Sequence, residues 1–338
     1  MFTFADFDNT IRIIDLLVPA VQALWCFFLG GSIGSFLNVV VYRLPLGLSV
    51  VSPPSFCPRC KTPISARDNL PVFGWLLLGG KCRTCREPIA ARYPIVEGIA
   101  GILLVVLAFA EPLSGGATLP LVRGFGAPQY PLYGMAVYHF ALLTTLLGAA
   151  LMAIDRSPIP RSYWLWALAI GLVPPLIWPT LRPVSLGWPM NIGTGAIEGL
   201  VGAVMGFAFG TFASPAAVAS PRETEQDLRA GGDAVLAGAC LGAYLQWQAA
   251  GGIMLAAAVA WSAWQLLRRL GTERQLPWLV LLFPITTVWI VGWRRLAESV
   301  RWGDVSLVAG ETPWYIATAV AVLVSVLCGA GHMLSRRM

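Results

Sequence analysis

Charge is scarce in this chain of 338 residues: only 12% of them are Asp, Glu, Lys or Arg, whereas 57% are hydrophobic. A mean hydropathy of +0.70 excludes an ordinary soluble domain. The net charge of +6 is not the signature of a nucleic-acid-binding protein, because the basic residues stand in the loops between apolar runs. The two histidines, His139 and His332, are isolated in the sequence, and we assign them no role.

Long windows without charge are the second consequence of this composition. Several of them reach the 18 to 22 residues, roughly, that a helix needs to cross a bilayer. The sequence therefore predicts an all-α polytopic membrane protein with about eight or nine transmembrane helices. The expected spans are about 17–42, 93–110, 131–154, 162–182, 194–213, 232–248, 251–267, 276–293 and 314–334. Pro174-Pro175 is expected to kink the fourth span, and only Gly251-Gly252 separates the sixth from the seventh.

Four of the seven cysteines stand in two Cys-x-x-Cys pairs, Cys57 with Cys60 and Cys82 with Cys85. Two tight turns that each present two thiolates can close a tetrahedron around Zn²⁺ and leave no open position for a catalytic water. We expect a small structural zinc-binding loop here, and a redox or disulfide pair is the alternative.

The distribution of Lys and Arg predicts which side of the membrane this loop occupies. With the loop inside and the spans alternating, the inner segments hold 17 of the 23 basic residues and the outer segments hold 6. Cytoplasmic loops carry the excess of Lys and Arg in membrane proteins. The loop is therefore expected in the cytosol, where thiols stay reduced and metal is favoured over disulfides.

Acidic residues at membrane spans are costly and are candidates for function. Asp155 ends the third expected span and Asp233 opens the sixth, so both are predicted at the cytosolic face. Two such carboxylates can share one proton and act as an aspartic-protease dyad. The structural alternatives are an N-cap role for Asp233 and pairing of Asp155 with Arg156 or Arg161. Three other polar residues at spans have non-catalytic expectations: Asn38 should bond across helices, Glu97 should be a helix-dipole partner, and Glu198 should be structural.

Five stretches of the chain match sequence motifs of one known protein family. They are Gly34-Ser35-Phe36-Leu37-Asn38-Val39-Val40 with Tyr42-Arg43-Leu44-Pro45, the two cysteine pairs, Asp68-Asn69-Leu70-Pro71, Arg92-Tyr93-Pro94-Ile95-Val96-Glu97, and Gly232-Asp233 through Gly238 to Gly242. On these residues the chain resembles the type IV prepilin peptidases, or leader peptidases/N-methyltransferases, which are GxGD-type membrane aspartic peptidases. The resemblance covers roughly residues 25–300.

The resemblance implies an enzyme of the bacterial inner membrane that cuts the basic leader from prepilins or type II secretion pseudopilins at the cytosolic face. It carries the two catalytic aspartates onto Asp155 and Asp233. It also implies that the new N-terminus is methylated with S-adenosylmethionine, as in many members. The implied partners are these substrates and the lipid bilayer, and no nucleic acid.

Three departures from the family pattern support an alternative, a non-catalytic relative that binds pilins as an assembly factor. Only four residues separate Asp155 from Pro160 where the family has about six, and Arg161 replaces an acid or amide. Val235 stands where the family often has Lys. The expected division of the chain is 1–42 with the first transmembrane helix, 43–92 as the zinc loop, 93–313 as the polytopic peptidase domain, and 314–338 as an added C-terminal helix.

Overall fold

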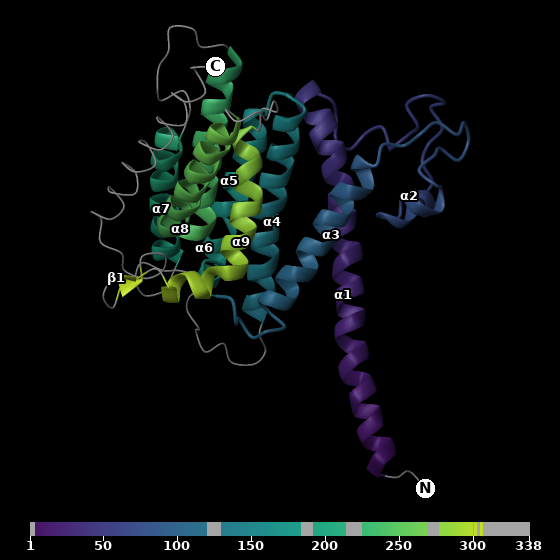
Figure 1. The fold of residues 1–338 in the computed structure, drawn as a ribbon, viewed down its shortest axis with the longest axis horizontal. Coiled ribbons are helices and arrows are strands. Elements are labelled where there is room, and N and C mark those ends of the chain that lie inside the picture. The colour runs from purple at the N-terminus through teal and green to yellow at the C-terminus, as the bar shows by residue number, and fades with distance from the viewer. Residues whose placement is uncertain are drawn as a thin grey trace. The chain divides into compact units, whose positions relative to one another are not determined.

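The structure is a computed structural model that describes residues 4–119, 130–183, 192–213, 225–268, 277–299, 301–302 and 305–306. Most of this part of the chain is helical (Figure 1). The longer helices are α1 (Phe4–Arg43), α3 (Arg92–Ala110), α4 (Tyr130–Ile154), α5 (Arg161–Leu172), α7 (Ile192–Ala213), α8 (Glu225–Arg268) and α9 (Trp278–Ser299). The shorter elements are η1 (Leu44–Leu46), η2 (Ala66–Asn69), α2 (Phe73–Leu77), α6 (Pro174–Ile177), η3 (Pro179–Leu181), and the antiparallel pair β1 (Arg301–Trp302) and β2 (Val305–Ser306).

Six of the described helical segments are long and apolar enough to cross a membrane. They are Leu17–Leu46, Arg92–Ala110, Pro131–Ile154, Ile192–Ala213, Arg229–Leu267 and Trp278–Ser299. The predicted all-α polytopic membrane fold is therefore confirmed. The expected span at 314–334 lies outside the described residues.

The expected span at 162–182 is broken at its two prolines. α5 ends at Leu172, α6 begins at Pro174, and η3 follows after Trp178. Proline has no N–H to donate and its ring clashes with the preceding turn, so the helix cannot continue. The 12 residues of α5 are too few to cross about 30 Å of hydrocarbon at about 1.5 Å per residue.

The 44 residues of α8 contain a reversal of direction at Gln246, whose φ of 71° and ψ of 166° are not helical. A Cβ built on Gly238 would lie 3.0 Å from Met254 Cε. In a continuous helix these residues would be about 24 Å apart along the axis. The chain therefore folds back at Gln246, which agrees with two separate expected spans but places their junction before Gly251.

The chain divides into two units, Met1–Arg43 with Gly47–Phe109 and Leu44–Leu46 with Ala110–Met338. In the first unit, glycines let α1 and α3 cross closely. A Cβ on Gly30 would lie 2.5 Å from Ala100 O, and one on Gly101 would lie 2.8 Å from Phe27 Cδ2. Small residues at such crossings allow helix backbones to approach each other in a membrane.

In the second unit α8 packs against α4, α5, α7 and α9, and α4 packs against α9. Glycines on α7 face glycines on α8. A Cβ on Gly242 would lie 1.8 Å from Gly202 O, and one on Gly206 would lie 2.1 Å from Gly238 O. This backbone contact holds the first half of α8, and with it Asp233, against α7.

Candidate metal centre and candidate active site

Four sulfur atoms converge in the loop between α1 and α3. The Sγ atoms of Cys57, Cys60, Cys82 and Cys85 all lie within 4.8 Å of one another. Cys57 and Cys85 are 3.7 Å apart, and Cys60 and Cys82 are 3.9 Å apart. Zn–S bonds of about 2.3 Å in a tetrahedron give an S···S edge of about 3.8 Å. The cluster can therefore hold a metal ion, and none of the described cysteines forms a disulfide.

The two cysteine pairs are built as copies of one turn. Residues 57–64 (CPRCKTPI) and 82–89 (CRTCREPI) repeat a pattern at an offset of 25 residues. In the first copy, the Cys57 N–H donates to Thr62 O at 3.0 Å and the Lys61 N–H donates to Cys57 O at 2.9 Å. The equivalent bonds of the second copy measure 2.8 and 3.1 Å, and the residue after each second cysteine has a φ of 58° or 62°. Each copy thus presents two sulfurs in the same way.

One ion pair joins the copies to each other, and a second joins the second copy to Asp68, which follows the first copy. Arg59 in the first copy pairs with Glu87 in the second. Arg83 in the second copy donates from Nε to Asp68 Oδ2 at 2.8 Å and from Nη2 to Asp68 Oδ1 at 2.5 Å. The Arg83 guanidinium holds the pKa of Asp68 at about 2. The two pairs brace the loop around its sulfur cluster.

Hydrogen bonds prepare part of the cluster for metal binding. The Thr62 hydroxyl and backbone lower the pKa of Cys60 to about 6, and the backbone N–H groups of Cys85 and Thr84 lower the pKa of Cys82. Although the Glu87 backbone lowers it, burial and the neighbouring thiols raise the pKa of Cys85 to about 11. Four thiolates so close together repel one another, so a bound cation favours the fully ionised set.

Asp233 lies inside α8, eight residues after Glu225. The buried Trp164 of α5 donates its indole Nε1–H to Asp233 Oδ1 at 2.9 Å. A Cβ built on the neighbouring Gly232 would meet no atom within 4 Å, so the backbone beside Asp233 is open. Because α8 begins two turns earlier, the N-cap alternative for Asp233 is wrong.

Asp155 lies at the C-terminal end of α4. Its N–H makes the last α-helical hydrogen bond of that helix, to Leu151 O at 3.0 Å. Arg156 then adopts a φ of 54°, and the Ser157 N–H donates to Met152 O at 3.0 Å, which closes the helix end. A carboxylate at a helix C-terminus faces the negative end of the helix dipole. Helix stability therefore gives no reason for an acid at position 155.

Contacts among three helices show that Asp155 and Asp233 lie toward the same end of them. The Tyr138 hydroxyl on α4 donates to Gly171 O on α5 at 2.6 Å, and its ring stacks on Tyr244 of α8 at 4.4 Å. From this common level, Asp155 lies 17 residues further along α4 and Asp233 lies 11 residues back along α8. The opposed directions of α4 and α8 bring both acids to one end, and their joint catalytic role stays a prediction.

Asn38 and Glu97 both make structural contacts in the first unit, and the bond of Asn38 across helices was expected. Asn38 Nδ2 donates to Tyr93 O at 3.3 Å and so links α1 to α3. Glu97 Oε2 accepts the Val72 N–H at 2.7 Å. Val72 has a φ of 63°, and the Phe73 N–H donates to Pro71 O at 2.6 Å, which makes a γ-turn. Since this conformation is unfavourable for a β-branched residue, the Glu97 carboxylate stabilises a strained turn.

Glu198 belongs to a buried polar cluster around Arg182. The Arg182 guanidinium donates to three backbone carbonyls: Ala243 O at 2.9 Å, Gly195 O at 2.7 Å and Gly171 O at 3.0 Å. Both Arg182 and Glu198 are buried, and Glu198 interacts electrostatically with the guanidinium. Arg182 thereby connects α5, α7 and α8, and the structural interpretation of Glu198 is supported.

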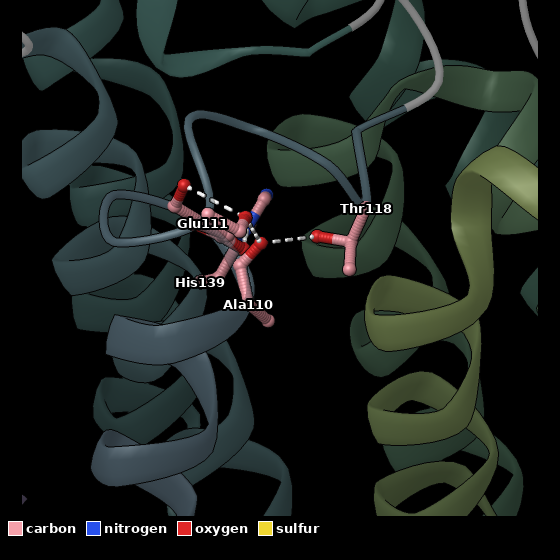
Figure 2. Close-up of polar contacts among 5 residues, drawn as sticks. Ala110, Glu111, Thr118 and His139 are labelled. Carbon is pink, nitrogen blue, oxygen red and sulfur yellow. Dashed lines mark hydrogen bonds and ion pairs between the residues drawn. The ribbon is translucent and has the colours of Figure 1, made fainter.

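His139 is not isolated in the fold, although it is in the sequence. Its Nδ1 lies 2.6 Å from Oε1 of Glu111, and both side chains are fully buried (Figure 2). The Thr118 hydroxyl donates to Ala110 O at 2.9 Å in the same loop, and Arg294 of α9 donates to Leu119 O at 3.1 Å. The loop after α3 is thus fixed to α4 and α9. Glu111 directly follows an apolar span, which was the signal available in the sequence.

A polytopic helical membrane protein with a cluster of four cysteines that can hold a metal ion, and with two acids at one end of its helices, is the class that these features define. Residues 28–110, which include both cysteine copies, match the family described as Bacterial Peptidase A24 N-terminal domain. No solved structure matches the chain.

Curated relatives named "Prepilin leader peptidase/N-methyltransferase" extend the match. The protein of Aeromonas salmonicida (strain A449) is 30% identical over 316 residues, which cover 85% of this chain and 91% of the relative. That of Myxococcus xanthus (strain DK1622) is 31% identical over 255 residues, 75% of this chain and 65% of the relative. That of Klebsiella pneumoniae is 34% identical over 169 residues, 48% of this chain and 62% of the relative. The chain spans less than two thirds of the last two relatives. It belongs to the prepilin leader peptidase/N-methyltransferase family, as the motifs predicted.

Proposed function

We propose that this chain is a membrane aspartic endopeptidase that removes the leader peptide from type IV prepilins or pseudopilins. The observation that carries the proposal is the Trp164–Asp233 hydrogen bond at the end of the helices where α4 brings Asp155. The relatives' names supply the substrate class and a second proposed activity, N-methylation. The proposed methyl donor, S-adenosylmethionine, comes from the family resemblance. Residues 93–313 form the peptidase domain in this proposal, with 1–42, 43–92 and 314–338 as the accompanying segments.

In the proposed reaction Asp155 and Asp233 share one proton. The ionised carboxylate takes a proton from a water molecule, whose oxygen attacks the carbon of the scissile peptide, while the protonated acid donates to the carbonyl oxygen. Collapse of the tetrahedral intermediate then breaks the C–N bond, and a proton passes to the leaving amine. The Trp164 N–H on Oδ1 of Asp233 fixes the rotation of that carboxylate and directs Oδ2 to the water.

The four cysteines hold a structural zinc ion in this proposal. Their four thiolates complete a tetrahedral coordination, which supplies a cross-link within the loop and no open position for substrate. The paired copies and their two ion pairs support this assignment.

We also propose that the chain lies in the bacterial inner membrane with the cysteine loop, Asp155 and Asp233 facing the cytosol, where a basic leader would be presented. The 17-to-6 distribution of Lys and Arg supports this orientation. Single cysteines introduced near residues 50, 158 and 225 should resist an impermeant thiol reagent added to intact cells. Labelling of any of these positions from outside would contradict the orientation.

Cleavage of a prepilin with a basic leader by the purified full-length protein tests the catalytic assignment. Asp155→Asn and Asp233→Asn should each abolish cleavage, because Asn cannot ionise, and the double variant should be no worse than either. Asp227→Asn, the same exchange six residues before Asp233 on α8, is the matched control and should cleave normally. Substantial cleavage by either single variant would refute the dyad.

The alternative is a non-catalytic assembly factor that binds pilins, and Arg161 and Val235 are the departures that favour it. The same assay distinguishes the two functions. Binding of the prepilin without cleavage by the wild-type protein, in the conditions where a curated relative cleaves it, would establish the assembly factor.

A further inference from the structure

An apolar segment interrupts the basic loop between α1 and α3. Residues 70–78 read Leu-Pro-Val-Phe-Gly-Trp-Leu-Leu-Leu, without a single polar side chain apart from the indole N–H. They form the γ-turn at Val72 and the short helix α2. The Trp75 indole donates to Ile89 O at 2.9 Å, so the segment is fixed to the second cysteine copy.

This segment lies beside the membrane-spanning helices of its unit and not beyond their ends (Figure 1). The ring of Phe73 stacks on Phe28 of α1 at 5.5 Å. Phe28 lies ten residues before Asn38, which bonds to the first turn of α3, and this distance along α1 is about 15 Å. Both Phe28 and Glu97, the acceptor of the Val72 N–H, lie inside apolar spans. The contacts therefore place segment 70–78 at a depth where its neighbours face the bilayer.

The outer face of the segment carries large apolar side chains that are mostly exposed. Leu77 is 78% exposed and Leu76 is 56% exposed. A membrane-spanning helix exposes such side chains to acyl chains, and an interfacial helix buries its apolar face at the boundary of headgroups and acyl chains. Trp25 of α1 and Ile102 of α3 are likewise 70% and 58% exposed, and the exposed face of α2 suits the same surroundings.

The charge of the surrounding loop suits anionic headgroups. Residues 43–92 contain eight of the 23 basic residues and two of the 17 acids, so the other 15 basic and 15 acidic residues cancel. The entire net charge of +6 therefore resides in this loop. Both of its acids, Asp68 and Glu87, are already paired with arginine. Lys81 lies three residues after the apolar segment and Arg86 lies in the second cysteine copy, and both carry charge that no acid of the loop balances.

We propose that residues 70–78 form a membrane wedge. The wedge inserts into the cytosolic interface of the bilayer beside α1 and α3, with Leu76 and Leu77 against acyl chains. Lys81 and Arg86 lie on anionic phospholipid headgroups at its edge. The wedge would hold the cysteine loop down on the membrane surface, and it does not depend on the proposed peptidase activity.

Nitroxide accessibility in the full-length protein tests the position of the wedge. Cys26, Cys240 and Cys328 are replaced by Ser, the four metal-binding cysteines are kept, and spin label is attached to Leu77→Cys or Val51→Cys. Val51 is the matched control, because it is 83% exposed and lies between Ser49 and Pro53, whose carbonyls bond to Arg43. In vesicles of phosphatidylcholine and phosphatidylglycerol at 7:3, the label at 77 should be several-fold more accessible to oxygen and less accessible to a water-soluble nickel chelate than the label at 51. Equal access of the nickel chelate to both labels would overturn the wedge. The spin label that attaches to the protein with the three Ser replacements and no added cysteine gives the background signal.

Retained lipids test the headgroup contact. Native mass spectrometry should find fewer phosphatidylglycerol molecules on Lys81→Gln/Arg86→Gln than on the wild type. Arg156→Gln/Arg161→Gln, which removes two charges from the loop between α4 and α5, should retain the wild-type number. Equal retention by the wild type and Lys81→Gln/Arg86→Gln, with metal content unchanged, would refute binding of anionic headgroups at the wedge.

Discussion

The indole N–H of Trp164 reaches across from α5 to Asp233 Oδ1 on α8, at 2.9 Å, from a completely buried position. Trp164→Phe keeps most of the ring volume but removes the donor. A hydrogen bond to a charged group contributes about 1.5–3 kcal/mol, so kcat for leader cleavage should fall about 10- to 100-fold. KM should not change, because the buried indole does not meet the substrate.

Two further variants separate this role from a merely structural one. Trp166→Phe makes the same exchange on the same helix at a side chain that is 72% exposed, and it should leave kcat unchanged. Trp164→His restores a ring N–H and should recover part of the lost kcat, whereas Trp164→Leu should not. A Trp164→Phe enzyme with wild-type kcat would show that the hydrogen bond does not position Asp233 for catalysis.

The sulfur cluster should bind one zinc ion per chain. Cys60→Ser and Cys82→Ser each remove one of four converging ligands, so the zinc content of the purified protein should fall well below one per chain. Cys26→Ser is the control, because Cys26 lies on α1 outside the cluster, and it should retain the metal. Wild-type protein with far less than one zinc after purification without chelator would contradict the assignment.

The Arg83–Asp68 pair should slow the loss of that metal. Asp68→Asn removes the charge that holds Arg83 of the second copy to η2, so transfer of zinc to a colorimetric chelator should be severalfold faster. The exchanged pair Asp68→Arg/Arg83→Asp should recover most of the wild-type rate. If the exchanged pair releases zinc as fast as Asp68→Asn does, charge pairing is not the cause.

The same pair has a defined pH dependence. Arg83 lowers the pKa of Asp68 to about 2, so the stabilisation is complete above the ordinary Asp pKa near 4 and is lost as the pH falls through about 2. The ratio of release rates between Asp68→Asn and wild type should therefore be constant from about pH 6 to 8. A ratio that changes across this interval would point to another titrating group.

Local sequence patterns predicted those features that depend on short-range chemistry. The Cys-x-x-Cys spacing predicted the sulfur cluster because each pair sits in one turn, and hydropathy predicted α1, α3, α4, α7 and α9 because a bilayer requires about 20 apolar residues. Family motifs predicted the relatives. The reversal in α8 was expected, but its position at Gln246 was not, because tertiary contacts override the weak signal of Gly251-Gly252.

Pairings between distant residues could not be predicted in the same way. His139 and Glu111 are 28 residues apart, and Trp164 and Asp233 are 69 apart, so only the packing of helices brings them together. Trp164 carries no sign in the sequence that separates it from the other 13 tryptophans. Asp155 and Asp233 were proposed as partners from the expected topology and from the family resemblance. The antiparallel course of α4 and α8 is the physical reason that both reach one end.

The glycine contact between α7 and α8 provides a final prediction, on stability. Gly242→Ala places a methyl group 1.8 Å from Gly202 O, and the clash is with backbone that cannot rotate away. Overpacking of this kind costs about 1–3 kcal/mol, so the midpoint of thermal unfolding in detergent should fall by several degrees. Gly292→Ala on α9 is the matched control, because its Cβ would meet nothing within 4 Å. Since alanine is a better helix former than glycine by up to about 1 kcal/mol, that variant should unfold at the wild-type temperature or slightly above it. If Gly242→Ala melts with Gly292→Ala, the two helices are not in backbone contact, and the support for Asp233 must come from α5 alone.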